Sequence, residues 1–79
     1  AGDYEQAFHY YNLLVDNSPE YVGTYYHLGK LLEKTGDKDR AVEIYRLGLN
    51  AARNKHDNHA YAELQGALNA AMGMDYEDD

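Results

Sequence analysis

The sequence predicts an all-α protein, built of antiparallel helix hairpins with four helices in total. Apolar residues recur at helical spacing in four segments, and no segment alternates with a period of two over a useful length. The breaks between these segments are only a few residues long. Because such short connections leave no room for a crossover, consecutive helices must pack side by side in opposite directions.

The first predicted helix covers residues 4–17. Pro19 disfavours a helical Ser18, so the helix is expected to end within the polar run that precedes this proline. One face of the segment carries aromatic and aliphatic side chains at helical spacing, which predicts that this face packs against a neighbour. These residues are Tyr4, Ala7, Phe8, Tyr11, Leu14 and Val15.

The second and third predicted helices cover residues 20–34 and 38–54, with a short turn between them. Gly36 can adopt the left-handed conformation that ends a helix, and Asp37 can cap the helix that follows. Each helix again has one apolar stripe. The stripes are Tyr21, Tyr25, Leu28 and Leu32 in the second helix, and Val42, Tyr45, Leu49 and Ala52 in the third.

The fourth predicted helix covers residues 58–72 and follows a polar break that contains the only metal candidates of the chain. His56 and His59, with an aspartate between them, could share an ion if a third ligand were close. We interpret the segment instead as a polar loop in which Asp57 or Asn58 caps the helix. His56 and His59 are therefore weak candidates, and no metal or other cofactor is expected.

Composition and charge limit the kinds of function. The chain has 79 residues, no cysteine and a net charge of −7, which predicts one small domain without disulfides. The negative balance argues against nucleic acid and against an anionic membrane surface, and no apolar stretch is long enough to span a bilayer. Residues 75–79 are an acidic run, interpreted as a tail behind a domain of residues 1–74. We expect a cytoplasmic protein.

A spacing of 34 residues relates the first predicted helix to the third. The matched residues are Gly2-Asp3 with Gly36-Asp37, Ala7 with Ala41, and Tyr11 with Tyr45. A weaker match with an offset of 36 relates the second helix to the fourth. Its pairs are Tyr25 with Tyr61, Leu28 with Leu64, and Leu32 with Leu68. The chain is therefore predicted to be an array of repeated hairpins.

These residues resemble the tetratricopeptide repeat, a unit of 34 residues with two helices. The residues that carry the resemblance are Tyr25, Leu28-Gly29, Leu32, Gly36, Ala41 and Tyr45. The resemblance implies a short right-handed solenoid with a complete repeat at residues 22–55. Residues 2–21 would be the second half of a truncated repeat, and residues 56–73 a degenerate capping helix, because Gln65 stands where a further repeat would have glycine.

The resemblance also implies a non-enzymatic protein-interaction module. In this family the first helix of each repeat lines a concave groove, which here would be walled by residues 22–34 and 59–70 and would bind a peptide or helix. Of the adjacent tyrosines Tyr25 and Tyr26, the first fits a core position, which leaves the second for the groove. The groove candidates are Tyr26, His27, Lys30, Glu33, Lys34 and Glu63.

Two other classes of function were weighed. If residues 2–21 are half of a repeat, helix 4–17 exposes apolar surface, and the chain could be a structural module that forms a homodimer through this helix. Few residues of the sequence could serve catalysis. The lone serine, Ser18, precedes a proline in a loop, and no glycine-rich phosphate loop is present. The sequence therefore predicts no enzyme.

Overall fold

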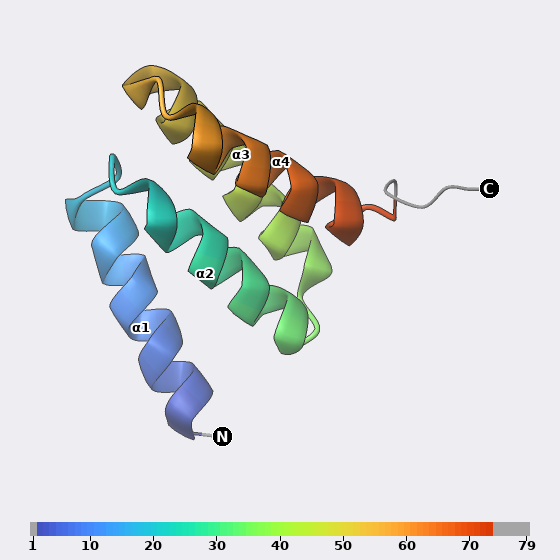
Figure 1. The fold of residues 1–79 in the computed structure, drawn as a ribbon. Coiled ribbons are helices and arrows are strands. Elements are labelled where there is room, and N and C mark those ends of the chain that lie inside the picture. The colour runs from blue at the N-terminus through green and yellow to red at the C-terminus, as the bar shows by residue number, and fades with distance from the viewer. Residues whose placement is uncertain (1, 74–79) are drawn as a thin grey trace.

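The computed structural model describes residues 2–73, which form four α-helices and no strand (Figure 1). The helices are α1 (Gly2–Asn17), α2 (Val22–Lys34), α3 (Lys38–Lys55) and α4 (Asn58–Ala71). The predicted all-α fold is thus confirmed. The acidic tail predicted at residues 75–79 lies outside the described residues. None of the four helices combines the length and the apolar character that a membrane crossing requires.

Consecutive helices run antiparallel and pack side by side (Figure 1). The α2 helix is central, because it packs against α1 on one side and against α3 and α4 on the other. The α1 helix lies at one edge of the array, and its helical neighbour within the described residues is α2. The arrangement is the stack of helix hairpins that the sequence predicts.

The start of α2 differs from the prediction, which placed it at residue 20. The backbone N–H of Tyr21 donates to the Ser18 carbonyl oxygen at 3.0 Å, so the residues before the helix form a turn. The Tyr25 hydroxyl reaches back and donates to the Pro19 carbonyl oxygen at 2.5 Å. This contact ties the turn to the helix, which begins at Val22.

The connections between the later helices follow the predicted chemistry. Gly36 has a φ of 93°, the left-handed conformation that ends α2 without a side-chain clash. The Asp37 carboxylate then accepts from the backbone N–H of Arg40 at 3.3 Å and caps α3. The Asp57 carboxylate likewise accepts from the backbone N–H of Ala60 at 3.1 Å and caps α4. Both polar breaks therefore act as helix boundaries.

The core of the described residues is formed by α2, α3 and α4. Tyr45 on α3 is fully buried, and its ring lies against the backbone of Gly29 on α2. A Cβ atom added at Gly29 would lie 2.2 Å from a ring carbon of Tyr45. Gly48 on α3 is a second close approach, where an added Cβ would lie 2.6 Å from that of Tyr25. The two helices cross closely because each has a glycine at the crossing.

The α1 helix is packed less completely than the other three. The residues of its predicted apolar stripe are half-buried or exposed, and none is buried. Tyr11, which the 34-residue spacing matches with the buried Tyr45, is only half-buried. Tyr10 and Leu13 are more open still, with 59% and 45% of their surface exposed. This difference arises because α2 covers only one side of α1.

A pair of glycine-to-alanine substitutions tests the helix crossing. Gly29→Ala should destabilise the fold by about 1–3 kcal/mol, because the Tyr45 ring is buried on all sides and has no room to move. Gly66→Ala on α4 meets no atom within 4 Å and should stabilise the fold by about 0.5–1 kcal/mol through helix propensity. Thermal melting measures both. If both substitutions shifted the melting temperature in the same direction, the close approach of Tyr45 to Gly29 would be contradicted.

Candidate functional site

The outward face of α2 brings several predicted site residues together. The inner face of this helix is buried against α3, so side chains at other positions along the helix point outward. Lys30 Nζ lies 5.6 Å from the ring centroid of Tyr26, a cation–π distance. The rings of Tyr26 and His27 meet edge to face at 5.8 Å. We call Tyr26, His27, Lys30 and Lys34 the α2 cluster.

Two of the predicted groove residues are carboxylates that already have partners. The Tyr45 hydroxyl donates to Oε2 of Glu33 at 2.5 Å, so this half-buried carboxylate is held against the core. Oε2 of Glu63 lies 3.3 Å from Nε2 of His59, one turn earlier on the same helix. The Glu33 carboxylate is therefore engaged within the chain, whereas Glu63 is exposed beside an exposed histidine. On α2, the cluster of Tyr26, His27, Lys30 and Lys34 is the part of the predicted set that lies together.

Buried phenols anchor α2 on both sides of this cluster. Burial raises the pKa of Tyr45, and the hydrogen bond to Glu33 and the charge of that carboxylate raise it further. Burial also raises the pKa of Tyr25, with a smaller contribution from the charge of Glu20. Both phenols therefore stay protonated at neutral pH and act as hydrogen-bond donors that hold the helix in place.

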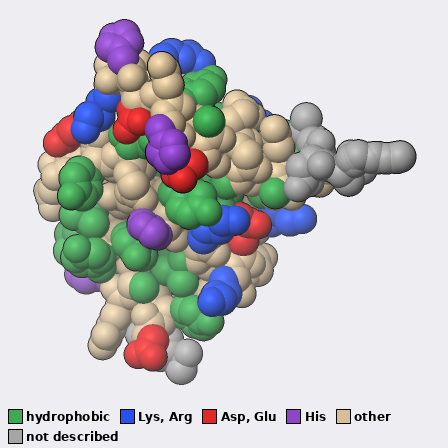
Figure 2. All heavy atoms as spheres, in the orientation of Figure 1, with side chains coloured by type: hydrophobic (Ala, Val, Ile, Leu, Met, Phe, Trp, Pro, Cys, Tyr) green, Lys and Arg blue, Asp and Glu red, His purple; other side chains and the backbone are tan. Residues whose placement is uncertain are grey.

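The α1 helix contributes rings that the sequence analysis did not assign to the site. The Tyr11 ring stacks on His27 of α2, with centroids 6.2 Å apart and planes inclined by 16°. The ring of Tyr10 meets Tyr11 edge to face at 5.5 Å. An array of four rings thus runs from α1 to the α2 cluster. Figure 2 shows hydrophobic, basic, acidic and His side chains close together on the face in the middle of the view.

Two cavities open along the seam between α1 and α2. One has a volume of about 400 Å³ and is lined by Ala7, Tyr11, His27, Lys30, Leu31 and Lys34. The other has a volume of about 380 Å³ and is lined by Tyr10, Tyr11, Leu14, Tyr21, Gly23, Thr24 and His27. They share Tyr11 and His27, so they adjoin, and we call them together the α1–α2 hollow. The wall of this hollow opposite α2 is therefore α1. The groove that the sequence analysis expected between residues 22–34 and 59–70 stays a prediction.

Sequence reasoning missed the α1 wall for a physical reason. The 34-residue match between Tyr11 and Tyr45 predicts the same environment for both rings. In the structure Tyr45 is fully buried, on a helix that packs against both α2 and α4, but Tyr11 is only half-buried, on a helix that packs against α2. The adjacent pair Tyr10-Tyr11 was a signal of aromatic surface, yet the pattern does not tell which side of a helix has a neighbour.

The metal candidates lie at a helix boundary. His56 ends α3 in the left-handed conformation with a φ of 58°, and His59 is paired with Glu63. Within residues 2–73, no three His, Asp or Glu side chains form a group that could hold a metal ion. The structure thus gives each histidine a different neighbourhood and does not bring a third ligand to them.

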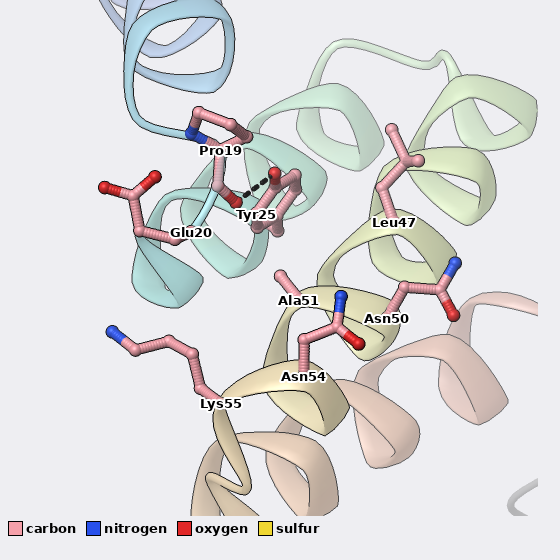
Figure 3. Close-up of a pocket in the computed structure, with 8 residues that line it drawn as sticks. All are labelled: Pro19, Glu20, Tyr25, Leu47, Asn50, Ala51, Asn54 and Lys55. Atoms are coloured by element: carbon pink, nitrogen blue, oxygen red, sulfur yellow. Dashed lines mark hydrogen bonds between the residues drawn. The ribbon is translucent and has the colours of Figure 1, made fainter.

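A further cavity of about 340 Å³ lies between the turn before α2 and the outer side of α3 (Figure 3). The Tyr25 hydroxyl points to the Pro19 carbonyl oxygen, so its hydrogen bond is already made. Asn50, Asn54 and Lys55 supply the polar lining from α3, beside the half-exposed Leu47, and Glu20 lines the cavity from the turn before α2. This cavity lacks the stacked rings of the α1–α2 hollow and its two lysines one helical turn apart. The α1–α2 hollow is therefore the stronger candidate site.

Comparisons with known proteins identify similar chains. The sequence profile of the tetratricopeptide repeat family matches residues 1–68. A solution NMR structure of a tetratricopeptide repeat domain protein from Salinibacter ruber is 36% identical with a TM-score of 0.88, and covers 98% of this chain and 78% of that chain. A crystal structure of such a protein from the same organism is 38% identical with a TM-score of 0.86, and covers 94% and 83%. No curated protein matches the sequence.

The raised pKa values of the two phenols predict an alkaline limit of stability. An unfolded tyrosine has a pKa of about 10, so both phenols favour the folded state below that pH, and their contribution is lost as the pH rises through the folded-state values. The free energy of unfolding should therefore fall above about pH 10. In Tyr45→Phe this fall should be shallower, because the group that titrates is gone. Urea unfolding followed by circular dichroism between neutral and alkaline pH measures both slopes, and equal slopes would contradict the prediction.

Proposed function

Because the chain belongs to the tetratricopeptide repeat family, we propose that it binds a peptide or helix of another protein through the outward face of α2. The repeats of this family generally serve as non-catalytic protein-interaction modules. The observation that carries the proposal is the α2 cluster, in which two aromatic rings and a lysine contact one another on an outward face. No catalytic step is part of the proposal.

The chemistry of the cluster supports recognition rather than packing alone. Tyr26 is half-buried beside the core and so keeps a fixed orientation, which lowers the entropy cost of binding. His27 and Lys30 are exposed, and together with the tyrosine they present two rings inclined by 80° with hydrogen-bond donors beside them. Aromatic residues in such settings are enriched among binding hot spots. An extended peptide or a helix could use this surface.

Self-association is the alternative function, with a homodimer through α1. The exposed Tyr10 and Leu13 favour it, since they place apolar area on the outer side of this helix. The charges oppose it, because α1 contains Asp3, Glu5 and Asp16 but no lysine or arginine. A two-fold contact between two α1 helices would bring these like charges together. We therefore favour a separate protein ligand.

The experiment selects peptide ligands from a random library on the full chain and maps their binding with matched variants. Tyr26→Ala should weaken binding of a selected peptide by about 30-fold, the effect of losing a typical hot spot. Lys30→Ala should weaken it less. Tyr4→Ala and Lys38→Ala remove the same side-chain types elsewhere and should leave the affinity unchanged. Fluorescence anisotropy measures the affinities, and light scattering over a concentration series measures self-association.

The proposal fails if the selected peptides bind Tyr26→Ala and Lys30→Ala as tightly as they bind the parent chain. It also fails if the chain is dimeric in dilute solution and the selected peptides bind only the dimer. Melting temperatures of all variants serve as the folding control. A Tyr26→Ala variant that loses affinity while it keeps its melting temperature supports recognition by this side chain, since an effect of misfolding would lower both.

A further inference from the structure

A second stripe of residues runs along the outer side of α3 and lines the cavity of Figure 3. This outer stripe consists of Leu47, Asn50, Ala51 and Asn54, which recur at helical spacing away from the buried residues of the helix. Leu47 exposes 50% of its surface, and both asparagines are exposed. The cavity has a volume of about 340 Å³ and lies between this stripe and the turn at residues 18–21, so we call it the turn–α3 cavity.

The turn–α3 cavity lies inside the array of helices, so its opening does not depend on a helix at either edge. Its walls are α3 and the turn that joins α1 to α2. On α1, the residues that share a cavity with the start of α3 are Phe8 and Asn12. Their matches 34 residues later are Val42 and Arg46. A helix stacked beside α3 in the same way would therefore meet those two residues and not the outer stripe.

The two asparagine amides of the outer stripe have no hydrogen-bond partner within the described residues. Among residues 2–73, the side-chain amides that bond to each other are those of Gln65 and Asn69 on α4, and Asn50 and Asn54 have no such bond. Asparagine is a weak helix former, so alanine, lysine or glutamate at these exposed positions would give a more stable helix. The stability of α3 therefore does not explain the two amides, and their donors and acceptors are available to a ligand.

The spacing of the two amides matches an extended polypeptide. Asn50 and Asn54 are four residues apart on an α-helix, which places them about 6 Å apart along its axis. Along an extended strand, the residues whose N–H and C=O groups face one side recur at about 6.6 Å. A side-chain amide donates through its NH₂ group and accepts through its oxygen, so each asparagine can bond both groups of one such residue.

We propose that the turn–α3 cavity binds an extended segment of a partner protein through the backbone of that segment. Asn50 and Asn54 bond alternate residues of the segment, and an apolar side chain of the segment lies on Leu47. Glu20 and Lys55 line the cavity with opposite charges, so a backbone without net charge is complementary to it. No residue of the α2 cluster lines this cavity, and the inference therefore goes beyond the proposed function.

A helix or a second copy of this chain suits the cavity less well. The backbone N–H and C=O groups inside a helix bond to one another and cannot pair with the asparagine amides. The described residues of a second copy are helical apart from short connections, of which the longest covers residues 18–21. That connection is a turn closed by the hydrogen bond from Tyr21 to Ser18. Residues 2–73 of a second copy therefore offer no extended segment.

The test uses the full chain and a capped synthetic peptide of about eight residues in which serine and valine alternate, a pattern that favours an extended conformation. Two further peptides differ only in N-methyl groups, on every serine nitrogen or on every valine nitrogen, so each loses the backbone donors of one edge. Two-dimensional NMR of the nitrogen-labelled chain follows the side-chain amides of Asn50 and Asn54. We expect both signals to shift in a saturable way with the first peptide, independently of salt, and at least one methylated peptide to lose this binding.

Variants of the chain locate the binding, with affinities measured by the anisotropy of labelled peptide. Asn50→Ala with Asn54→Ala should weaken the first peptide about 30-fold, the effect expected for two hydrogen bonds. The melting temperature of this double variant should not fall, because alanine is the better helix former, and this separates lost recognition from misfolding. Leu47→Ala should weaken binding about fivefold through lost apolar contact. Asn12→Ala, the matched control on α1, and Tyr26→Ala in the α2 cluster should leave the affinity unchanged.

Each other outcome overturns the inference. Binding by the double asparagine variant as tight as by the parent chain removes the amides from the site, and equal binding of all three peptides removes the backbone argument. Shifts confined to the α2 cluster, with affinity lost in Tyr26→Ala, support the proposed function and refute this second site. A dimer in light scattering that the double asparagine variant dissociates makes a second copy the occupant. The absence of saturable binding by the first peptide also refutes the inference.

Discussion

The contact between the Tyr45 ring and the backbone of Gly29 is the constraint on which the rest of the structure depends. It brings α2 and α3 close enough for their apolar faces to interdigitate, and it leaves no space for a side chain at residue 29. The same ring carries the hydroxyl that holds Glu33, so one residue fixes both the separation and the rotation of α2. The rotation decides which α2 side chains face outward.

The outward face of α2 follows from this packing. The inner side chains of α2 pack against α3. On another face of the helix, the Tyr26 ring lies close to both the His27 ring and the Lys30 ammonium group. The α1 helix then extends the surface by stacking Tyr11 on His27. Little reorganisation is needed before a ligand meets this surface, which favours binding. The proposed recognition site is thus a consequence of how α2 is held.

The repeat pattern predicts contacts well where both partners lie within the described helices. Gly36 and Asp37 end and begin helices as predicted, and Tyr45 of the predicted apolar stripe is buried, because each acts through a neighbour close in the sequence or through an adjacent helix. Tyr11 differs from its match Tyr45 because α2 covers only one side of α1, in agreement with the expectation that helix 4–17 exposes apolar surface. A periodic sequence describes the face of a helix, but not what covers that face.

The sequence by itself determined the four helices, their order and the family, because helix periodicity, capping residues and glycine turns act locally. Its choice of groove residues on α2 stays a prediction. Only the tertiary structure decided that Glu33 is held by Tyr45 and that α1 supplies the second wall of the hollow. Those outcomes depend on the distances between side chains of different helices, which result from packing and are not encoded at any single position.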